Sequence, residues 1–289
     1  MSANFPTKHY SGLSISHPQG VTRLKWHCLC RSLEDPLFSP QALSDGMQLG
    51  ASMEIDLRVR ADGGFVLLHD EVLEGETTGR GPVREAHAAD LRALNMKEGG
   101  DALTLSEDLA EMIGTAHPDA LLQFDMKDDL ATIGERGMDH LQSRFRDAGR
   151  QVIVSGFDLD LIIAVKQRLP DVRRGIDPSD KLHEIGRDHG LAAMEKELLA
   201  DLDGPTEADT VYLHWPLVLE TARRGLDLIG LCHDRNRLVD AWTYNPHDPQ
   251  AGFNDAEWRD FSALIALNPD QVTTDEAPAV ERAWSARQA

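Results

Sequence analysis

Residues 51–83 read ASMEIDLRVRADGGFVLLHDEVLEGETTGRGPV, and the organisation of the whole chain can be understood from them. Apolar and polar residues alternate over 52–58, a pattern that predicts a strand with one buried face. Because successive side chains of a strand point to opposite faces, Glu54 and Asp56 lie on the same face. Two neighbouring carboxylates are ligands that a hard metal ion prefers.

A short hairpin follows this strand. Residues 60–64 (RADGG) supply a glycine turn, and residues 65–68 form a return strand that ends at His69 and Asp70. A histidine close to two carboxylates indicates an acid/base group beside a metal site. A solvated edge strand with incidental charges would show the same pattern. The rest of the sequence is needed to decide between a metal site and such an edge strand.

Composition excludes several classes of partner. The 289 residues carry a net charge of -20, from 29 Lys and Arg against 49 Asp and Glu. Such a surface repels nucleic acid and anionic membranes, so we expect neither as a partner. The apolar fraction of 41% is enough for the core of one large α/β domain or two small ones. An acidic protein that handles an anionic substrate needs a cation, or local Lys and Arg side chains, to hold it.

Cysteine usage and the N-terminus indicate the compartment. Cys28, Cys30 and Cys232 are too few for a disulfide framework and fit a reducing compartment. Residues 1–20 are polar, lack the apolar run of a signal peptide and are predicted to be a loose arm. No stretch approaches the roughly 18 apolar residues of a membrane span. The sequence therefore predicts a cytoplasmic protein without integral membrane association.

Strand and helix patterns alternate regularly along the chain. We expect the eight main strands at 22–30, 52–58, 120–127, 151–155, 173–176, 210–214, 238–244 and 271–274. Helical patterns lie between them, including one at 40–48 with Ser39 as its N-cap and one at 216–235. Eight such units predict an α/β fold, a (β/α)₈ TIM-type barrel, as a single domain over 21–289 with a small insertion at about 70–119. A doubly wound open sheet is the alternative, but no G-x-G-x-x-G follows the first strand.

Polar residues fall where a barrel places its chemistry, at the carboxyl ends of the strands. The residues concerned are His27 from the first strand, Glu54, Asp56 and His69 from the second, Asp125 and Lys127 from the third, and Ser155, His214 and Trp242 from later strands. This shared location favours a functional site over incidental surface charge.

The Cys28-Leu29-Cys30 segment beside His27 has two interpretations. It could belong to a zinc or redox site, but no second cysteine pair exists to complete four ligands. On a strand, both thiols would lie on the face opposite His27. Buried core cysteines are therefore the favoured interpretation.

Eight short motifs occur in one order over about residues 23–280. They are Met53-Glu54-Ile55-Asp56, Arg60-Ala61-Asp62-Gly63, His69-Asp70, Thr77-Thr78-Gly79-Arg80-Gly81, Asp125-Met126-Lys127, Ser155-Gly156-Phe157, Trp242-Thr243-Tyr244-Asn245 and Thr274-Asp275-Glu276-Ala277-Pro278. In this order they resemble the glycerophosphodiester phosphodiesterase family. The resemblance implies a metal-dependent phosphodiesterase in a (β/α)₈ barrel.

The resemblance also implies a role for individual residues. One divalent cation, Mg²⁺ or Ca²⁺, would be held by three carboxylates: Glu54, Asp56 and Asp125. His27 and His69 would be the catalytic acid/base pair, and Lys127 would bind the phosphate of a small-molecule phosphodiester. A substrate hydroxyl would attack phosphorus and expel the alcohol, and water would then open the cyclic phosphate to a phosphomonoester.

The chain departs from the family pattern near its start. The family has H-R-G and then P-E-N-T, whereas this chain has His27-Cys28-Leu29 and residues 36–39 (PLFS). Arg31 could replace the missing phosphate-binding arginine, or it could be an exposed loop residue. Trp242 could line the substrate cleft or serve only in packing.

Two other functions remain open at this point. Phospholipase D-like lyases share the two histidines, the E-x-D pair and an Asp as third carboxylate, and they stop at the cyclic phosphate. The W-T-x-N and T-D-x-P segments count against that class. A barrel that binds a phosphodiester without cleaving it is the third possibility, suggested by the missing arginine.

Overall fold

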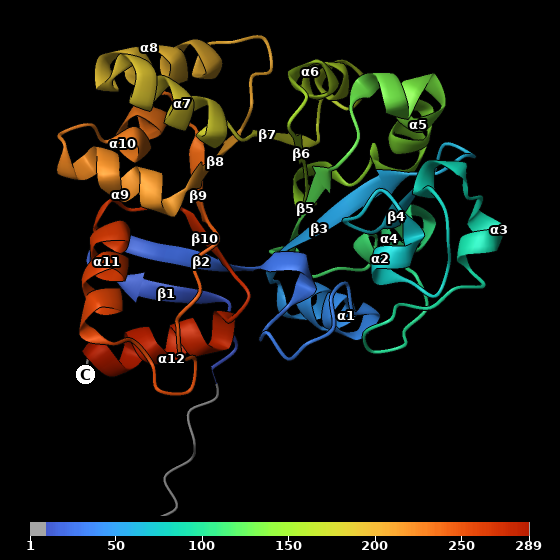
Figure 1. The fold of residues 1–289 in the computed structure, drawn as a ribbon, viewed down its shortest axis with the longest axis horizontal. Coiled ribbons are helices and arrows are strands. Elements are labelled where there is room, and N and C mark those ends of the chain that lie inside the picture. The colour runs from blue at the N-terminus through green and yellow to red at the C-terminus, as the bar shows by residue number, and fades with distance from the viewer. Residues whose placement is uncertain (1–9, 289) are drawn as a thin grey trace, which may run out of the picture.

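The computed structural model describes residues 10–288. Within them, eight parallel strands close into a barrel in the order β2-β10-β9-β8-β7-β6-β5-β3, and β3 pairs back onto β2 (Figure 1). The strands are β2 (Gly20–Trp26), β3 (Ser52–Val59), β5 (Leu121–Met126), β6 (Val152–Gly156), β7 (Arg173–Ile176), β8 (Thr210–His214), β9 (Leu238–Trp242) and β10 (Gln271–Thr274). The (β/α)₈ prediction is confirmed.

Two antiparallel strands flank the barrel. β4 (Phe65–Leu67) pairs with β3 and forms the predicted hairpin, while β1 (Ser14–His17) pairs with β2. The prediction of a loose arm is wrong for β1, because Ile15 is buried and the indole of Trp284 donates a hydrogen bond to the carbonyl of Ser16. Residues 1–9 of that predicted arm lie outside the described residues.

Helices cover the outside of the barrel (Figure 1). They are α1 (Pro40–Leu49), α5 (Leu130–Phe145), α6 (Leu159–Arg168), α7 (Ser179–His189), α8 (Leu191–Leu202), α9 (Trp215–Arg223), α10 (Leu228–His233), α11 (Asp255–Ala266) and α12 (Ala277–Gln288). Ser39 caps α1 as predicted, since its hydroxyl accepts a hydrogen bond from the Ala42 amide. The single helix expected at 216–235 is two helices, because Gly225 adopts a φ of 92° between them.

The segment between β4 and β5 lies beside β3 and β4, at one side of the barrel (Figure 1). It contains α2 (Leu73–Glu76), the 3₁₀ turn η2 (Val83–Glu85), α3 (Ala88–Leu91) and α4 (Ser106–Ile113). Arg60, at the end of β3, ties the hairpin to α4. Its buried guanidinium donates to both Glu107 carboxylate oxygens at 3.0 and 2.8 Å and to Asp62 at 2.9 Å. This anchor fixes the hairpin that carries His69.

Strand alternation divides apolar from polar side chains. In β3, Met53, Ile55 and Leu57 are fully buried in the hydrophobic core that the helices cover, while Glu54 and Asp56 point into the barrel. Most barrels fill their interior with branched apolar side chains. Here the interior is largely polar, so its groups must satisfy one another.

A hydrogen-bonded network fills that interior. The Lys25 ammonium lies 2.6 Å from Asp240 and also donates to Gln123. The other carboxylate oxygen of Asp240 accepts from Thr273 at 2.7 Å, and Gln123 donates to Ser155 at 2.9 Å. These pairings compensate the burial of charged and polar groups below the strand ends.

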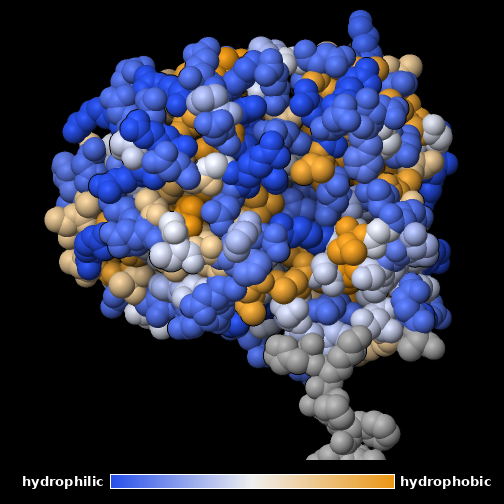
Figure 2. All heavy atoms as spheres, turned by 180° about the vertical axis from the view of Figure 1, so that it is seen from behind, coloured by the Kyte–Doolittle hydropathy of each residue, from blue (hydrophilic) through white to orange (hydrophobic). Residues whose placement is uncertain are grey.

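The face in Figure 2 is mainly hydrophilic, with small and separate hydrophobic areas, as the net charge of -20 leads one to expect. Among the described residues, no helix is both long and apolar enough to span a bilayer.

Replacement of Arg60 by Met tests the anchor of the hairpin. It should lower the free energy of unfolding by about 3 kcal/mol at neutral pH, because it leaves the Glu107 carboxylate without its partner. Urea denaturation measures this change. Arg92→Met is the matched control, since its pair with Asp108 is 50% and 37% exposed and should be worth below about 1 kcal/mol.

The loss should also depend on pH. Burial alone raises the pKa of Glu107, but the hydrogen bonds and charge of Arg60 outweigh burial and lower that pKa to about 2. A carboxyl group with a lowered pKa stabilises the fold above its ordinary pKa, and this contribution disappears as pH falls through the folded value. The difference between Arg60→Met and wild type should therefore shrink as pH falls from 4.5 toward about 2. A constant difference over that range would contradict this account of the anchor.

Candidate active site

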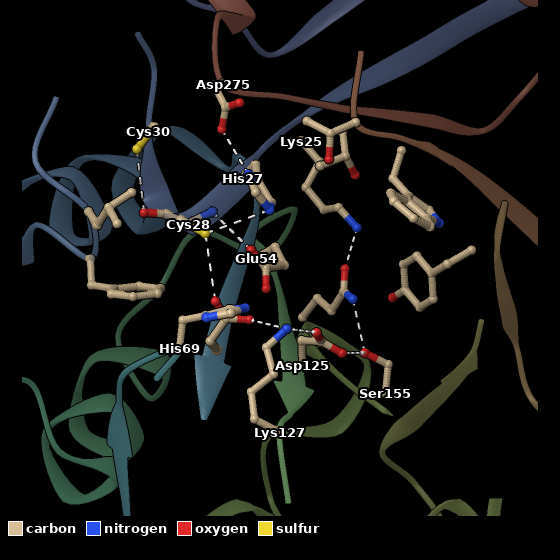
Figure 3. A pocket seen from close by; sticks show the side chains of 18 of the residues that line it. Lys25, His27, Cys28, Cys30, Glu54, His69, Asp125, Lys127, Ser155 and Asp275 are labelled. Atoms are coloured by element: carbon tan, nitrogen blue, oxygen red, sulfur yellow. Dashed lines mark hydrogen bonds and ion pairs between the residues drawn. The ribbon is translucent and has the colours of Figure 1, made fainter. Parts of the chain in front are cut away.

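A cavity of about 740 Å³ opens where the barrel strands end (Figure 3). The predicted site residues that line it are His27, Glu54, Asp56, His69, Asp125, Lys127, Ser155 and Trp242. Parallel strands deliver their carboxyl ends to the same rim of the barrel, which explains why residues more than 200 positions apart meet here.

Three carboxylates converge at the centre of the cavity. Glu54, Asp56 and Asp125 each present an oxygen within 4.8 Å of the others. The register of β3 and β5 pairs Asp56 directly with Asp125. Burial and then the neighbouring Asp56 raise the pKa of Glu54 well above its usual value, so a cation here would relieve both the desolvation and the repulsion. An all-oxygen donor set with this charge fits Mg²⁺ or Ca²⁺.

Lys127 lies against two of these carboxylates. Its ammonium is 2.8 Å from Asp56 and 2.6 Å from Asp125. Burial opposes its charged form, but the two carboxylates outweigh burial and raise the pKa of Lys127. The lysine thus supplies a fixed positive charge to the cavity, and Figure 3 shows it below Asp125.

His27 stands at the start of a 3₁₀ turn, η1 (His27–Leu29), directly after β2. Its Nδ1 lies 2.8 Å from Asp275, whose other carboxylate oxygen accepts from the Asn245 amide. Burial lowers the pKa of His27, but the Asp275 hydrogen bond and the charges of Glu54 and Asp56 outweigh it and raise the pKa to about 8. With Nδ1 engaged by Asp275, Nε2 is the nitrogen directed at the cluster.

Cys28 is placed differently from the prediction. The expected strand over 22–30 ends at Trp26, and the chain then turns with left-handed φ angles of 47° at Cys28 and 64° at Leu29. The Cys28 sulfur consequently lies 3.6 Å from His27 Nε2 and 3.7 Å from Asp56, so its predicted position opposite His27 is wrong. The prediction that Cys28 and Cys30 are buried is confirmed.

His69 is held mainly through its backbone. Glu76 accepts hydrogen bonds from the amides of His69 and Asp70, at 3.0 and 2.8 Å, and Arg58 donates to the His69 carbonyl at 2.9 Å. Its imidazole Nδ1 is 3.3 Å from Asp70, and the side chain is 60% exposed. The residue thus lines the cavity while its ring stays open to solvent.

The structure does not bring Arg31 into the cavity. Its guanidinium pairs with Asp35 and Asp45 at 3.3 and 3.2 Å and lies 5.8 Å from the Trp26 ring. Trp242 does line the cavity, and its ring lies 4.9 Å from that of His214.

Five further residues of the cavity were not predicted from the sequence to belong to the site. Lys25, Cys28, Asp177, Tyr212 and Asp275 all line it. Two of them had a signal in the sequence: Asp275 belongs to the T-D-x-P segment, and Lys25 shares a strand face with His27 in the predicted alternation. The contact between Asp275 and His27 joins the two ends of the chain, so no local pattern could predict it.

Solved structures share this fold. A Silicibacter pomeroyi protein assigned to the glycerophosphoryl diester phosphodiesterases superposes with a TM-score of 0.70 and 17% identity, covering 94% of this chain and 96% of that one. An Oleispira antarctica phosphodiesterase, solved with the product sn-glycerol-3-phosphate, superposes with a TM-score of 0.63 and 17% identity. The match covers 91% of this chain and 96% of that one. The protein YqiK of Bacillus subtilis is 27% identical over 157 residues, which are 50% of this chain but only 63% of that relative.

A family model described as "Glycerophosphoryl diester phosphodiesterase family" matches residues 39–278. The match includes the three carboxylates and His69, and it begins after His27 and Cys28, where the chain departs from the H-R-G and P-E-N-T motifs. The chain therefore belongs to the glycerophosphoryl diester phosphodiesterase family, a family of phosphoric diester hydrolases.

Proposed function

We propose that this chain is a metal-dependent phosphodiesterase that hydrolyses a glycerophosphodiester, or a related small phosphodiester, to an alcohol and a phosphomonoester. One observation carries the proposal: three convergent carboxylates, two histidines and a lysine share one cavity at the carboxyl ends of the strands. Among the fold neighbours, the Oleispira antarctica enzyme was solved with sn-glycerol-3-phosphate, a phosphomonoester of the class proposed as product here.

Glu54, Asp56 and Asp125 would hold one divalent cation, Mg²⁺ or Ca²⁺. When bound, such a cation neutralises charge on the phosphoryl oxygens and lowers the pKa of a nearby hydroxyl. A bound cation would also explain how a protein with a net charge of -20 can bind an anionic substrate, because the cation lies between the two negative charges.

The two histidines would move the protons. His27, whose pKa the Asp275 hydrogen bond helps to raise, can give a proton from Nε2 to the departing alcohol. His69, which is more exposed, can accept the proton of the attacking hydroxyl. Asp275 holds the His27 ring in one orientation through Nδ1.

Lys127 would bind the phosphate. It forms ion pairs with two of the three carboxylates, Asp56 and Asp125, whose oxygens become available to a divalent cation once the lysine turns to the phosphate. Arg31 does not share this role in our proposal, because Asp35 and Asp45 hold it outside the cavity. One ammonium therefore replaces a planar guanidinium, which makes phosphate recognition less directional.

The proposed compartment is the cytoplasm. All three cysteines are free and buried, which suits a reducing environment.

Turnover can be followed directly by phosphorus NMR. The purified protein is incubated with glycerol and sugar phosphodiesters in Mg²⁺ or Ca²⁺, and then with EDTA. We expect a phosphomonoester to form with the metal and not after chelation. Accumulation of a cyclic phosphate would support the lyase alternative, and binding without turnover would support the non-cleaving barrel.

Two substitutions separate proton transfer from metal binding. His69→Ala should lower turnover by about 10²–10⁴-fold, the usual contribution of a general acid or base, with little change in metal affinity. Glu54→Gln should weaken metal binding at least about 10–100-fold, the loss seen even for residues that only hydrogen-bond to a metal ligand. Steady-state kinetics and calorimetric metal titration measure the two effects.

His189→Ala is the control, because this exposed histidine ends α7 and does not line the cavity. Its kinetics and metal affinity should match those of wild type. Near-normal turnover by His69→Ala would show that His69 has been given the wrong role.

A further inference from the structure

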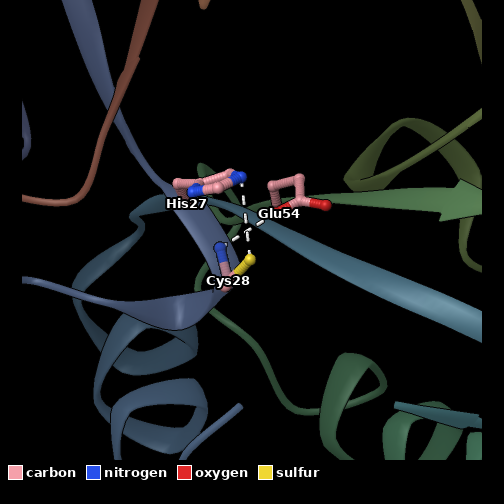
Figure 4. A group of neighbouring side chains, drawn as sticks. All are labelled: His27, Cys28 and Glu54. Atoms are coloured by element: carbon pink, nitrogen blue, oxygen red, sulfur yellow. Dashed lines mark hydrogen bonds between the residues drawn. The ribbon is translucent and has the colours of Figure 1, made fainter. Parts of the chain in front are cut away.

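His27, Cys28 and Glu54 form a second set of potential metal ligands (Figure 4). Each offers one ligand atom, and these three atoms lie within 4.8 Å of one another. The set shares Glu54 with the three-carboxylate site but contains a nitrogen and a sulfur donor. We propose that these three side chains bind a thiophilic divalent cation of the Zn²⁺ class.

The spacing of the donors fits such an ion. Zinc binds sulfur at about 2.3 Å and nitrogen or oxygen at about 2.0–2.1 Å, so neighbouring donors of a tetrahedral site lie about 3.5 Å apart. The Cys28 sulfur is 3.6 Å from His27 Nε2 and 3.7 Å from an Asp56 oxygen. The sulfur thus needs little movement to become a ligand, and Asp56 is placed to complete a fourth position.

The His27 ring already has the orientation of a metal ligand. Zinc-bound histidines usually donate their other ring nitrogen to a carboxylate, which fixes the ring and raises its basicity. Asp275 has this position at Nδ1, and Asn245 in turn holds Asp275. Nε2 is left to face the Cys28 sulfur and Glu54.

The backbone ties two of the ligands together. Cys28 adopts a left-handed φ of 47°, and its amide donates to Glu54 Oε2 at 2.9 Å. This conformation turns the thiol toward the carboxylates, where the family motif has an arginine. When the ion binds, the Cys28 thiol and a protonated His27 Nε2 each release a proton to solvent, so the step balances without any redox change.

The two ligand sets should select different ions. Glu54, Asp56 and Asp125 offer oxygens only, which suit Mg²⁺ and Ca²⁺, whereas sulfur and imidazole donors favour Zn²⁺ and Co²⁺. A bound Zn²⁺ would occupy His27 Nε2, the atom that transfers the proton. Inhibition by Zn²⁺ follows, and this consequence alone rests on the proposed function.

Cobalt spectroscopy tests the site without any turnover. The full chain is freed of metal with a chelator and titrated with Co²⁺, whose bond to a thiolate gives a near-ultraviolet charge-transfer absorption. We expect that absorption at one equivalent in wild type, and its displacement by Zn²⁺. Its absence from wild type would overturn the proposal.

Single-cysteine variants identify the ligand. Cys28→Ser should lose the absorption and bind Zn²⁺ at least about tenfold more weakly, with Mg²⁺ binding unchanged. Cys30→Ser and Cys232→Ser are matched controls, because both cysteines are buried and neither belongs to the ligand set. Retention of the absorption in Cys28→Ser would overturn the proposal.

X-ray absorption spectroscopy of the zinc-loaded wild-type protein identifies the ligand atoms without any substitution. One sulfur neighbour at about 2.3 Å is expected, and a shell of nitrogen and oxygen alone would overturn the site. Finally, Zn²⁺ should inhibit Mg²⁺-loaded wild type more strongly than Cys28→Ser. Equal inhibition of the two proteins would refute the predicted inhibition, whereas the metal site itself is tested by the spectra. A lack of turnover in the absence of Zn²⁺ would instead count against the proposed function.

Discussion

The burial of two carboxylates inside a closed barrel is the constraint on which this structure depends. Glu54 and Asp56 are only 5% and 2% exposed, and they point to the same interior face of β3. Charges removed from water are costly unless partners compensate them. Lys127 provides one such partner, and the open side of the cluster is suited to a divalent cation. The chemistry at this site follows from the cost of keeping those carboxylates buried.

The rest of the barrel interior obeys the same rule. Below the carboxylates, Lys25 pairs with Asp240 and donates to Gln123, which donates in turn to Ser155. The Lys25 ammonium also lies 4.5 Å from the centroid of the Tyr212 ring. The Ser155 hydroxyl in turn lies 3.3 Å from Asp125, so this network reaches the carboxylate cluster. A polar interior gives up some hydrophobic stabilisation and in return holds the site side chains in fixed positions.

The loss of the arginine motif changes the balance of charge in the cavity. Arg31 is bound to Asp35 and Asp45, so in the proposed function phosphate recognition would fall to Lys127 and to a bound cation. The residue at the arginine position, Cys28, contributes a sulfur beside His27 instead. One difference from the family motif thus removes a fixed positive charge and, in our proposal, would add a soft metal ligand.

The sequence by itself determined the barrel, the positions of its strands and the carboxylates, because period-two alternation and strand–helix alternation are local signals. It also gave His27, His69 and Lys127 as residues of one rim. Only the tertiary structure decided how they are held. The Asp275 contact to His27 spans 248 positions, and the turn of Cys28 into the cavity requires left-handed backbone angles that a strand pattern hides. The sequence left two interpretations of Arg31 open for the same reason, since whether a long side chain enters a cavity depends on which carboxylates the fold brings near it.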